Sequence, residues 1–169
     1  MARHRGFTLV EIMVSVIIIA MMAALTIPFM GRSNRDRLSA AGELLASDMR
    51  YARLASMASP QDPVVVRFNA NGDGWILARA STPSTPIVRS DTGAAWSVVM
   101  GQDRAASSPG VKLSLTNVAA STIAFSVFGA VKNASGTPRI TFNTDTVQAG
   151  QSPLVLEVTT ATGEPLIQW

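Results

Sequence analysis

The sequence predicts an α+β fold in which one long N-terminal helix packs on an antiparallel β-sheet head. Two observations lead to this class. Residues 7–59 carry helical patterns, first a continuous apolar run and then a stripe with helical spacing. After Pro60 the helical period disappears, and short β-type runs alternate with loops rich in Ser, Thr, Pro and Gly. A helix followed by a run of strands is the chain order of an α+β domain.

The first element is an apolar segment, residues 7–30, which follows a basic leader ending at Gly6. As a helix it would be about 36 Å long, against about 30 Å for the hydrocarbon core of a bilayer, so it is long enough to span a membrane. Because Arg3 and Arg5 precede it, the positive-inside rule places the N-terminus in the cytoplasm and the head outside. A secretory signal has its small-residue cleavage site after the apolar core. The reversed order here predicts that the apolar helix stays on the mature chain.

Two residues inside this segment need an explanation. Glu11 is an ionisable group in an apolar helix, where it costs about 2.5–3.5 kcal/mol and is usually functional and paired. The alternative is a carboxylate that merely lies at the membrane face. Pro28 removes a helical hydrogen bond and predicts a bend. In the other interpretation, Pro28 marks the end of the membrane helix.

Residues 31–59 predict an amphipathic continuation of the helix, which ends at Ser59-Pro60. Its apolar stripe consists of Leu38, Ala41, Leu45, Met49 and Ala52. Charged residues of alternating sign are expected on a solvated face, namely Arg35, Asp36, Glu43, Asp48, Arg50 and Arg53. The apolar stripe would pack on the sheet.

The head, residues 60–169, is predicted to be an antiparallel β domain. Its expected strands are Val64–Phe68, Trp75–Ala78, Ser97–Met100, Val111–Leu115, Thr122–Phe128, Arg139–Phe142, Leu154–Thr159 and Leu166–Trp169. The longest expected loops are Ala80–Ala95 and Gly101–Gly110. The segment Asn69–Gly74 matches half of a calcium loop, but Ala80 stands where a bidentate Glu is needed, so we expect a tight turn instead.

Composition leaves little room for catalysis. The chain has no Cys, and its one His, His4, lies in the leader. The head therefore has no Ser-His, Cys-His or His-metal constellation, and we expect neither an enzyme nor a cofactor or metal. The net charge of +3 is a weak electrostatic footprint for nucleic acid.

The string Gly6-Phe7-Thr8-Leu9-Val10-Glu11 and the apolar helix after it resemble the N-terminus of type IV prepilins and type II secretion pseudopilins. The resemblance implies that a prepilin peptidase cuts between Gly6 and Phe7 and methylates the new amine of Phe7. It also implies that Glu11 pairs with the amine of a neighbouring subunit during assembly, and that a helix proline such as Pro28 is common at this distance.

The string Leu44–Arg53, with the pattern Leu-x-x-Asp-x-Arg-x-Ala-Arg, is similar to the H-type (GspH/FimT-like) family, and so is Thr122–Gly129. This resemblance implies a minor pseudopilin of the type II secretion system, in a short periplasmic pseudopilus that takes part in protein export. The alternatives are a FimT-like minor pilin of type IV pili, for adhesion, motility or DNA uptake, and an unprocessed signal-anchored periplasmic binding domain.

The corresponding parts are a leader at 1–6, a transmembrane assembly helix at 7–30, an amphipathic helix at 31–59 and a periplasmic β domain at 60–169. The expected location is the bacterial inner membrane, with one span. The expected partners are other pilins or pseudopilins through the N-terminal helix, the prepilin peptidase and the membrane. Some FimT-like pilins bind DNA through a C-terminal Gly-Arg-x-Arg motif, whereas this chain has Gly163-Glu164-Pro165-Leu166, so no specific nucleic acid is expected.

Overall fold

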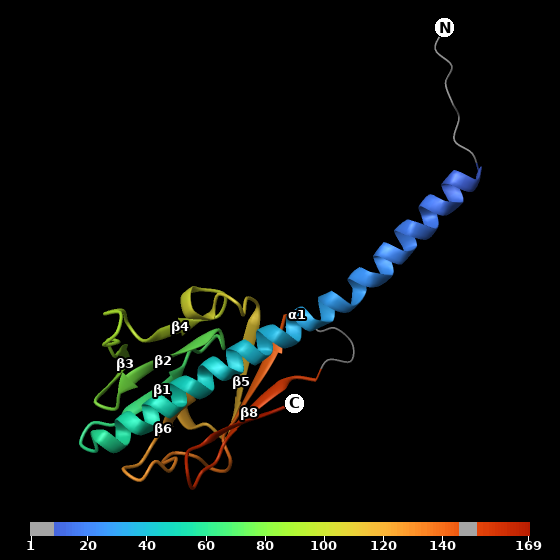
Figure 1. Ribbon diagram of the computed structural model, residues 1–169. Coiled ribbons are helices and arrows are strands. Elements are labelled where there is room, and N and C mark those ends of the chain that lie inside the picture. The colour runs from blue at the N-terminus through green and yellow to red at the C-terminus, as the bar shows by residue number, and fades with distance from the viewer. Residues whose placement is uncertain (1–8, 146–151) are drawn as a thin grey trace. The chain divides into compact units, whose positions relative to one another are not determined.

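A single long helix, α1 (Leu9–Ala58), opens the structure (Figure 1). The computed structural model describes residues 9–145 and 152–169, without the side chains of residues 23–33. The chain divides into two compact units, Met1–Arg35 and Asp36–Trp169, and α1 runs through the boundary between them. Helix is continuous through Pro28, whose side chain is outside the described set, so the predicted bend stays a prediction.

The second unit contains two antiparallel sheets. The first has five strands in the order β3-β2-β1-β6, with β4 also pairing with β2, and the second has four in the order β5-β7-β8-β9. The strands are β1 (Val64–Phe68), β2 (Gly74–Arg79), β3 (Thr82–Pro86), β4 (Ser97–Val99), β5 (Val111–Thr116), β6 (Thr122–Ala124), β7 (Arg139–Thr144), β8 (Leu154–Val158) and β9 (Pro165–Gln168). Two 3₁₀ turns complete the head, η1 (Asp103–Ala105) and η2 (Ala119–Ser121). The predicted α+β class is confirmed.

The core lies between the second half of α1 and the inner faces of both sheets, which the helix crosses in Figure 1. All five residues of the predicted apolar stripe are buried. The sheets supply buried residues at alternate positions, such as Ile140 and Phe142 of β7 and Leu154 and Leu156 of β8. This packing explains why an amphipathic segment follows the apolar one. In the head only one face of the helix packs on the core, so an apolar stripe on that face is sufficient.

Asp48 does not lie on the solvated face, and that part of the sequence interpretation is wrong. Its side chain is 1% exposed. Asp48 follows Leu45 by three residues and precedes Ala52 by four, so helical geometry places it on the buried face with them. Its charge is met there by partners from the sheet side, described below.

Two predicted head segments also differ from the structure. Strand β3 lies inside the expected loop Ala80–Ala95, because a strand with two prolines looks like a loop in sequence but is tolerated at a sheet edge. The expected strand Thr122–Phe128 ends at Ala124, since the chain then turns through Ser126 and Gly129. Asn69–Gly74 is a tight turn, as predicted, with the Gly72 N–H donating to the Asn69 carbonyl oxygen at 3.0 Å.

Candidate functional site

The first fourteen residues of α1 form an apolar surface that the described part of the chain leaves uncovered. Exposure of its large apolar side chains runs from 50% at Val14 to 76% at Leu9. Its members are Leu9, Val10, Ile12, Met13, Val14, Val16, Ile17, Ile18, Ile19, Met21 and Met22. They surround the helix instead of forming one stripe. A helix that is apolar on all sides belongs inside an apolar environment, which is either lipid or other helices. We call this set the N-terminal apolar surface.

Glu11 carries the one carboxylate among residues 9–22, and it is exposed within this surface. One turn further on, the Ser15 hydroxyl donates to the Glu11 backbone carbonyl at 2.8 Å. This bond keeps the hydroxyl on its own helix, so Ser15 adds little polarity to the surface. Of the sequence-predicted sites, Gly6 and Phe7 lie outside the described residues, and the roles of Glu11 and Pro28 stay predictions.

Within the described residues, no helix contains a stretch apolar enough and long enough to cross a bilayer.

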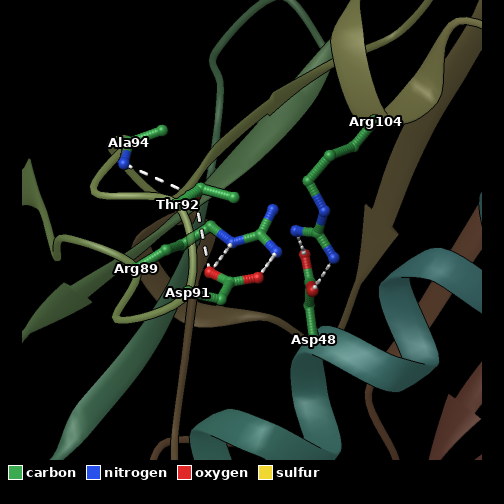
Figure 2. A network of polar contacts seen from close by, with 6 residues as sticks. All are labelled: Asp48, Arg89, Asp91, Thr92, Ala94 and Arg104. Carbon is green, nitrogen blue, oxygen red and sulfur yellow. Dashed lines mark hydrogen bonds and ion pairs between the residues drawn. The ribbon is translucent and has the colours of Figure 1, made fainter.

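In the head, the Asp48 carboxylate joins α1 to the sheet side of the molecule (Figure 2). Arg104, at η1, donates from Nη2 to Asp48 Oδ1 at 2.9 Å and from Nη1 to Oδ2 at 3.1 Å. The indole Nε1 of the fully buried Trp75 donates to Oδ2 at 2.9 Å. A bidentate guanidinium and an indole donor together satisfy a carboxylate that burial would otherwise destabilise.

A second node ties the same helix to the start of β9. Arg50 Nε donates to Glu164 Oε1 at 3.0 Å, and Arg53 Nη1 donates to Glu164 Oε2 at 2.9 Å. The Asp, Arg and Arg of the pattern at residues 45–53 therefore all hold α1 to the head. The Glu164 carboxylate therefore accepts hydrogen bonds from two cationic side chains of the helix.

An aromatic and cationic cluster surrounds Trp96. The Tyr51 ring stacks on it with 4.2 Å between ring centroids. The guanidinium carbons of Arg89 and Arg104 lie 5.3 and 5.5 Å from the Trp96 centroid. Both arginines also bind carboxylates, Arg104 to Asp48 and Arg89 to Asp91, and the Arg89 hydrogen bond lowers the pKa of Asp91 (Figure 2). With their charges paired, these arginines fit a structural role better than phosphate binding.

In the two described ranges, no three His, Cys, Asp or Glu side chains gather as metal ligands. In the Asn69–Gly74 turn, the Asn69 side-chain amide donates to Asp73 Oδ1 at 2.9 Å, so these two groups bind one another.

The comparisons with known proteins concern the N-terminal segment. Residues 1–27 match the family model described as the prokaryotic N-terminal methylation motif. The chain therefore carries a type IV pilin-like signal, which is typical of structural subunits rather than enzymes. The signal implies processing by a prepilin peptidase, assembly with other pilin-like subunits and inner-membrane anchoring through the N-terminal helix. No curated protein and no solved structure matches the chain.

Sequence reasoning missed the role of Asp48 and of Arg104. For Asp48 the signal was available, because its spacing from Leu45 and Ala52 is that of the buried stripe. For Arg104 it was not, since 56 residues separate it from Asp48 and it lies in an expected loop.

Proposed function

We propose that this protein is a minor pseudopilin of the type II secretion system, assembled into a short periplasmic pseudopilus that takes part in protein export. The observation that carries the proposal is the methylation motif at residues 1–27, followed by the exposed N-terminal apolar surface. The chain would be made as an inner-membrane precursor with its head in the periplasm. A prepilin peptidase would cut between Gly6 and Phe7 and methylate the amine of Phe7.

Assembly would then transfer the N-terminal apolar surface from lipid to a bundle of neighbouring helices. Between two apolar environments the hydrophobic effect contributes little, so packing and polar pairing decide the transfer. Glu11 is the one carboxylate among residues 9–22, and it would supply the polar pairing. Its carboxylate, placed against the free amine of a neighbouring Phe7, would fix the axial register of two helices and neutralise both charges. A bend at Pro28 would direct the helix from the bundle into the head.

The FimT-like minor pilin remains the second candidate, because the same motif and the same apolar surface serve a type IV pilus equally well. Its DNA-uptake branch finds less support, because Glu164 repels phosphate and already binds Arg50 and Arg53. An unprocessed signal-anchored binding domain is the third candidate, and it predicts an intact N-terminus.

The test is the intact mass and N-terminal sequence of the membrane-extracted chain, expressed with and without a prepilin peptidase. We expect a mature chain that begins at N-methylated Phe7 only when the peptidase is present. A Gly6→Val variant should stay uncut, while Gly31→Val, a matched change beyond the cleavage site, should be cut normally. An uncut chain in every case would exclude both filament proposals.

A second experiment, in the organism that encodes the chain, distinguishes the type II secretion system from the type IV pilus. Deletion of the gene should reduce the export of secreted proteins and leave type IV pili in place. Loss of pili with normal secretion would replace the first proposal with the FimT-like one.

A further inference from the structure

The two sheets of the head leave several edge strands, and most of these edges are protected. An unprotected edge presents backbone N–H and C=O groups that can pair with another strand. Strand β3 carries Pro83 and Pro86, and the Arg67 side chain donates to the Pro83 carbonyl. Strand β6 is closed by the neighbouring segment, because Lys132 N–H donates to the Ala124 carbonyl at 2.9 Å and Asn133 Oδ1 accepts from Ala124 N–H.

The remaining edges of the first sheet and of β5 are also short or occupied. Strand β4 has three residues. Strand β5 donates from Leu113 N–H to the Gly72 carbonyl at 2.7 Å, so the β1–β2 turn covers it. It also carries the exposed charge of Lys112.

Strand β9 is different. It is the last strand of the second sheet and, in the part of the chain that the structure describes, pairs with β8. Its four residues, Pro165 to Gln168, include no charge and no proline after the first. Leu166 is 51% exposed and Ile167 is 37% exposed. This edge therefore lacks the charges and interior prolines that block pairing with another strand.

The register with β8 shows which backbone groups face outward. Thr159 N–H donates to the Glu164 carbonyl, so Thr159 and Glu164 form a hydrogen-bonded pair. Bonded and non-bonded pairs alternate in an antiparallel ladder, which makes Leu156 and Ile167 a non-bonded pair. Val158, in the adjacent non-bonded pair, indeed donates away from β9, to the Pro138 carbonyl at 3.0 Å. The N–H and C=O of Ile167 therefore point away from β8, to the edge.

We propose that β9 is a self-association edge, at which two copies of this chain pair their β9 strands antiparallel about Ile167. In this register the Ile167 N–H of each copy donates to the Ile167 carbonyl of the other. The side chains that meet are apolar or neutral: Ile167 against Ile167, Leu166 against Gln168, and Pro165 against Trp169. No like charges face each other, so the strand is complementary to itself, which a two-fold contact requires. The two four-stranded sheets would become one continuous sheet.

Such a contact is small, so it depends on confinement. Two copies anchored in one membrane have a high effective concentration, and a weak contact then becomes populated. The inference goes beyond the proposed function, since it concerns the heads and needs no cleavage at Gly6.

The test uses cysteine crosslinking of the full chain in membranes without a prepilin peptidase. The chain has no cysteine of its own, so any disulfide reports the introduced positions. Leu166→Cys and Gln168→Cys are co-expressed with different tags and oxidised. The proposed register places these two side chains opposite each other, with Cβ atoms about 4.5–5.5 Å apart, whereas two Leu166 positions lie on a diagonal about 7–8 Å apart. The mixed pair should crosslink several-fold more than either position with itself.

Matched controls separate pairing from collision. Leu54→Cys with Val88→Cys, two exposed apolar positions on other elements, should give the collision level. Ile167→Pro removes the edge N–H and should lower the mixed crosslink about tenfold or more, while Ile167→Val keeps it. A second assay uses the chain without introduced cysteines and measures the dimer by chemical crosslinking. In this assay Leu166→Lys should reduce the amount of dimer, and Leu54→Lys should not. Unchanged melting of each variant shows that the head is folded.

A mixed crosslink at the collision level would overturn the proposal, and so would disulfides to another protein in place of the second copy. If the chain is never cleaved but the mixed crosslink forms, the filament proposals fail and this inference stands.

Discussion

Asp48 is a buried carboxylate of α1 that accepts three side-chain hydrogen bonds, from Trp75 and Arg104. Replacing it with alanine leaves the Trp75 indole and the Arg104 guanidinium without their acceptor. Removing one partner of a buried ion pair costs about 3–5 kcal/mol, and because Arg104 is partly exposed we expect the lower end, about 3 kcal/mol. Urea unfolding followed by tryptophan fluorescence measures this loss.

Asp48→Asn is the informative companion, because it keeps an oxygen for Trp75 and loses the charge for Arg104. We expect it to fall between wild type and Asp48→Ala. The control is Asp36→Ala, an exposed acid of the same helix, which should change the free energy of unfolding by less than about 0.5 kcal/mol. Equal stability of Asp48→Ala and wild type would show that the network does not stabilise the head.

Asp62 gives the head a predictable response to acid. The Ser81 backbone N–H donates to Asp62 Oδ1 and the Ser81 hydroxyl to Oδ2, and these bonds lower the pKa of Asp62 below its ordinary value of 3.8. A group whose pKa is lower in the folded state stabilises that state above the unfolded pKa, and the stabilisation is lost as the pH falls through the folded pKa. The melting temperature should therefore fall below about pH 4. Asp62→Asn should show a smaller fall over the same range, and an identical fall would assign the acid sensitivity to other carboxylates.

At the same scale, the sequence was informative about apolar residues and less so about polar ones. Leu45 and Met49 follow from helical spacing alone, because burial of an apolar side chain needs only the correct face. The environment of Asp48 depends on Trp75 and Arg104, which reach it from other parts of the fold. Pairing over such separations leaves no periodic signal in one sequence.

At the scale of elements, the turn before β9 sets the geometry of the final hairpin. Gly163 has a φ of +67°, and a Cβ there would lie 2.1 Å from the Gly129 carbonyl oxygen and 3.0 Å from the Phe125 ring. Gly163→Ala therefore combines left-handed strain of about 1–2 kcal/mol with a clash against backbone, and we expect a loss of about 3 kcal/mol. Thermal or urea unfolding measures it.

Gly93 is a matched control for this turn. Its φ of +68° is nearly the same, but a Cβ there meets nothing within 4 Å. Gly93→Ala should therefore cost only the strain, about 1–2 kcal/mol. If both variants lose the same stability, the close approach of Gly129 to Gly163 contributes nothing.

Elements with a side-chain pattern were predictable, and elements defined by their neighbours were not. The bounds of β1 follow from a compact run of mostly β-branched and aromatic residues, Val64–Phe68. Strand β3, with the sequence Thr-Pro-Ser-Thr-Pro, exists because β2 offers it an edge, so its own sequence indicates a loop. The end of β6 at Ala124 depends on the turn at Gly129, which interrupts an apolar run that otherwise continues to Phe128.

At the scale of the whole molecule, one helix serves two kinds of surface. Its residues 9–22 expose apolar side chains on all sides, while its residues 38–52 bury one stripe in the head. The change within α1 from an apolar segment to an amphipathic one is visible in the sequence. The sequence therefore predicts that the second segment packs on the sheets through one stripe. The cleavage and methylation sites at Gly6 and Phe7 stay predictions, since these two residues lie outside the described part of the chain.

Substitution of Glu11 tests the proposed role of the first segment of α1 in assembly. In the proposed assembly, Glu11→Leu removes the carboxylate that pairs with the amine of Phe7 but leaves the apolar surface and the head intact. A charge-assisted hydrogen bond contributes about 1.5–3 kcal/mol, so incorporation into the filament should fall about tenfold or more. Cleavage at Gly6 should continue, because the variant chain still reaches the membrane. The measurement compares sheared filament fractions with total membrane-bound chain.

Glu43→Leu, which changes an exposed carboxylate of the same helix within the head unit, is the control and should assemble normally. Equal incorporation of the Glu11 and Glu43 variants would mean that packing of the apolar surface alone sets the register.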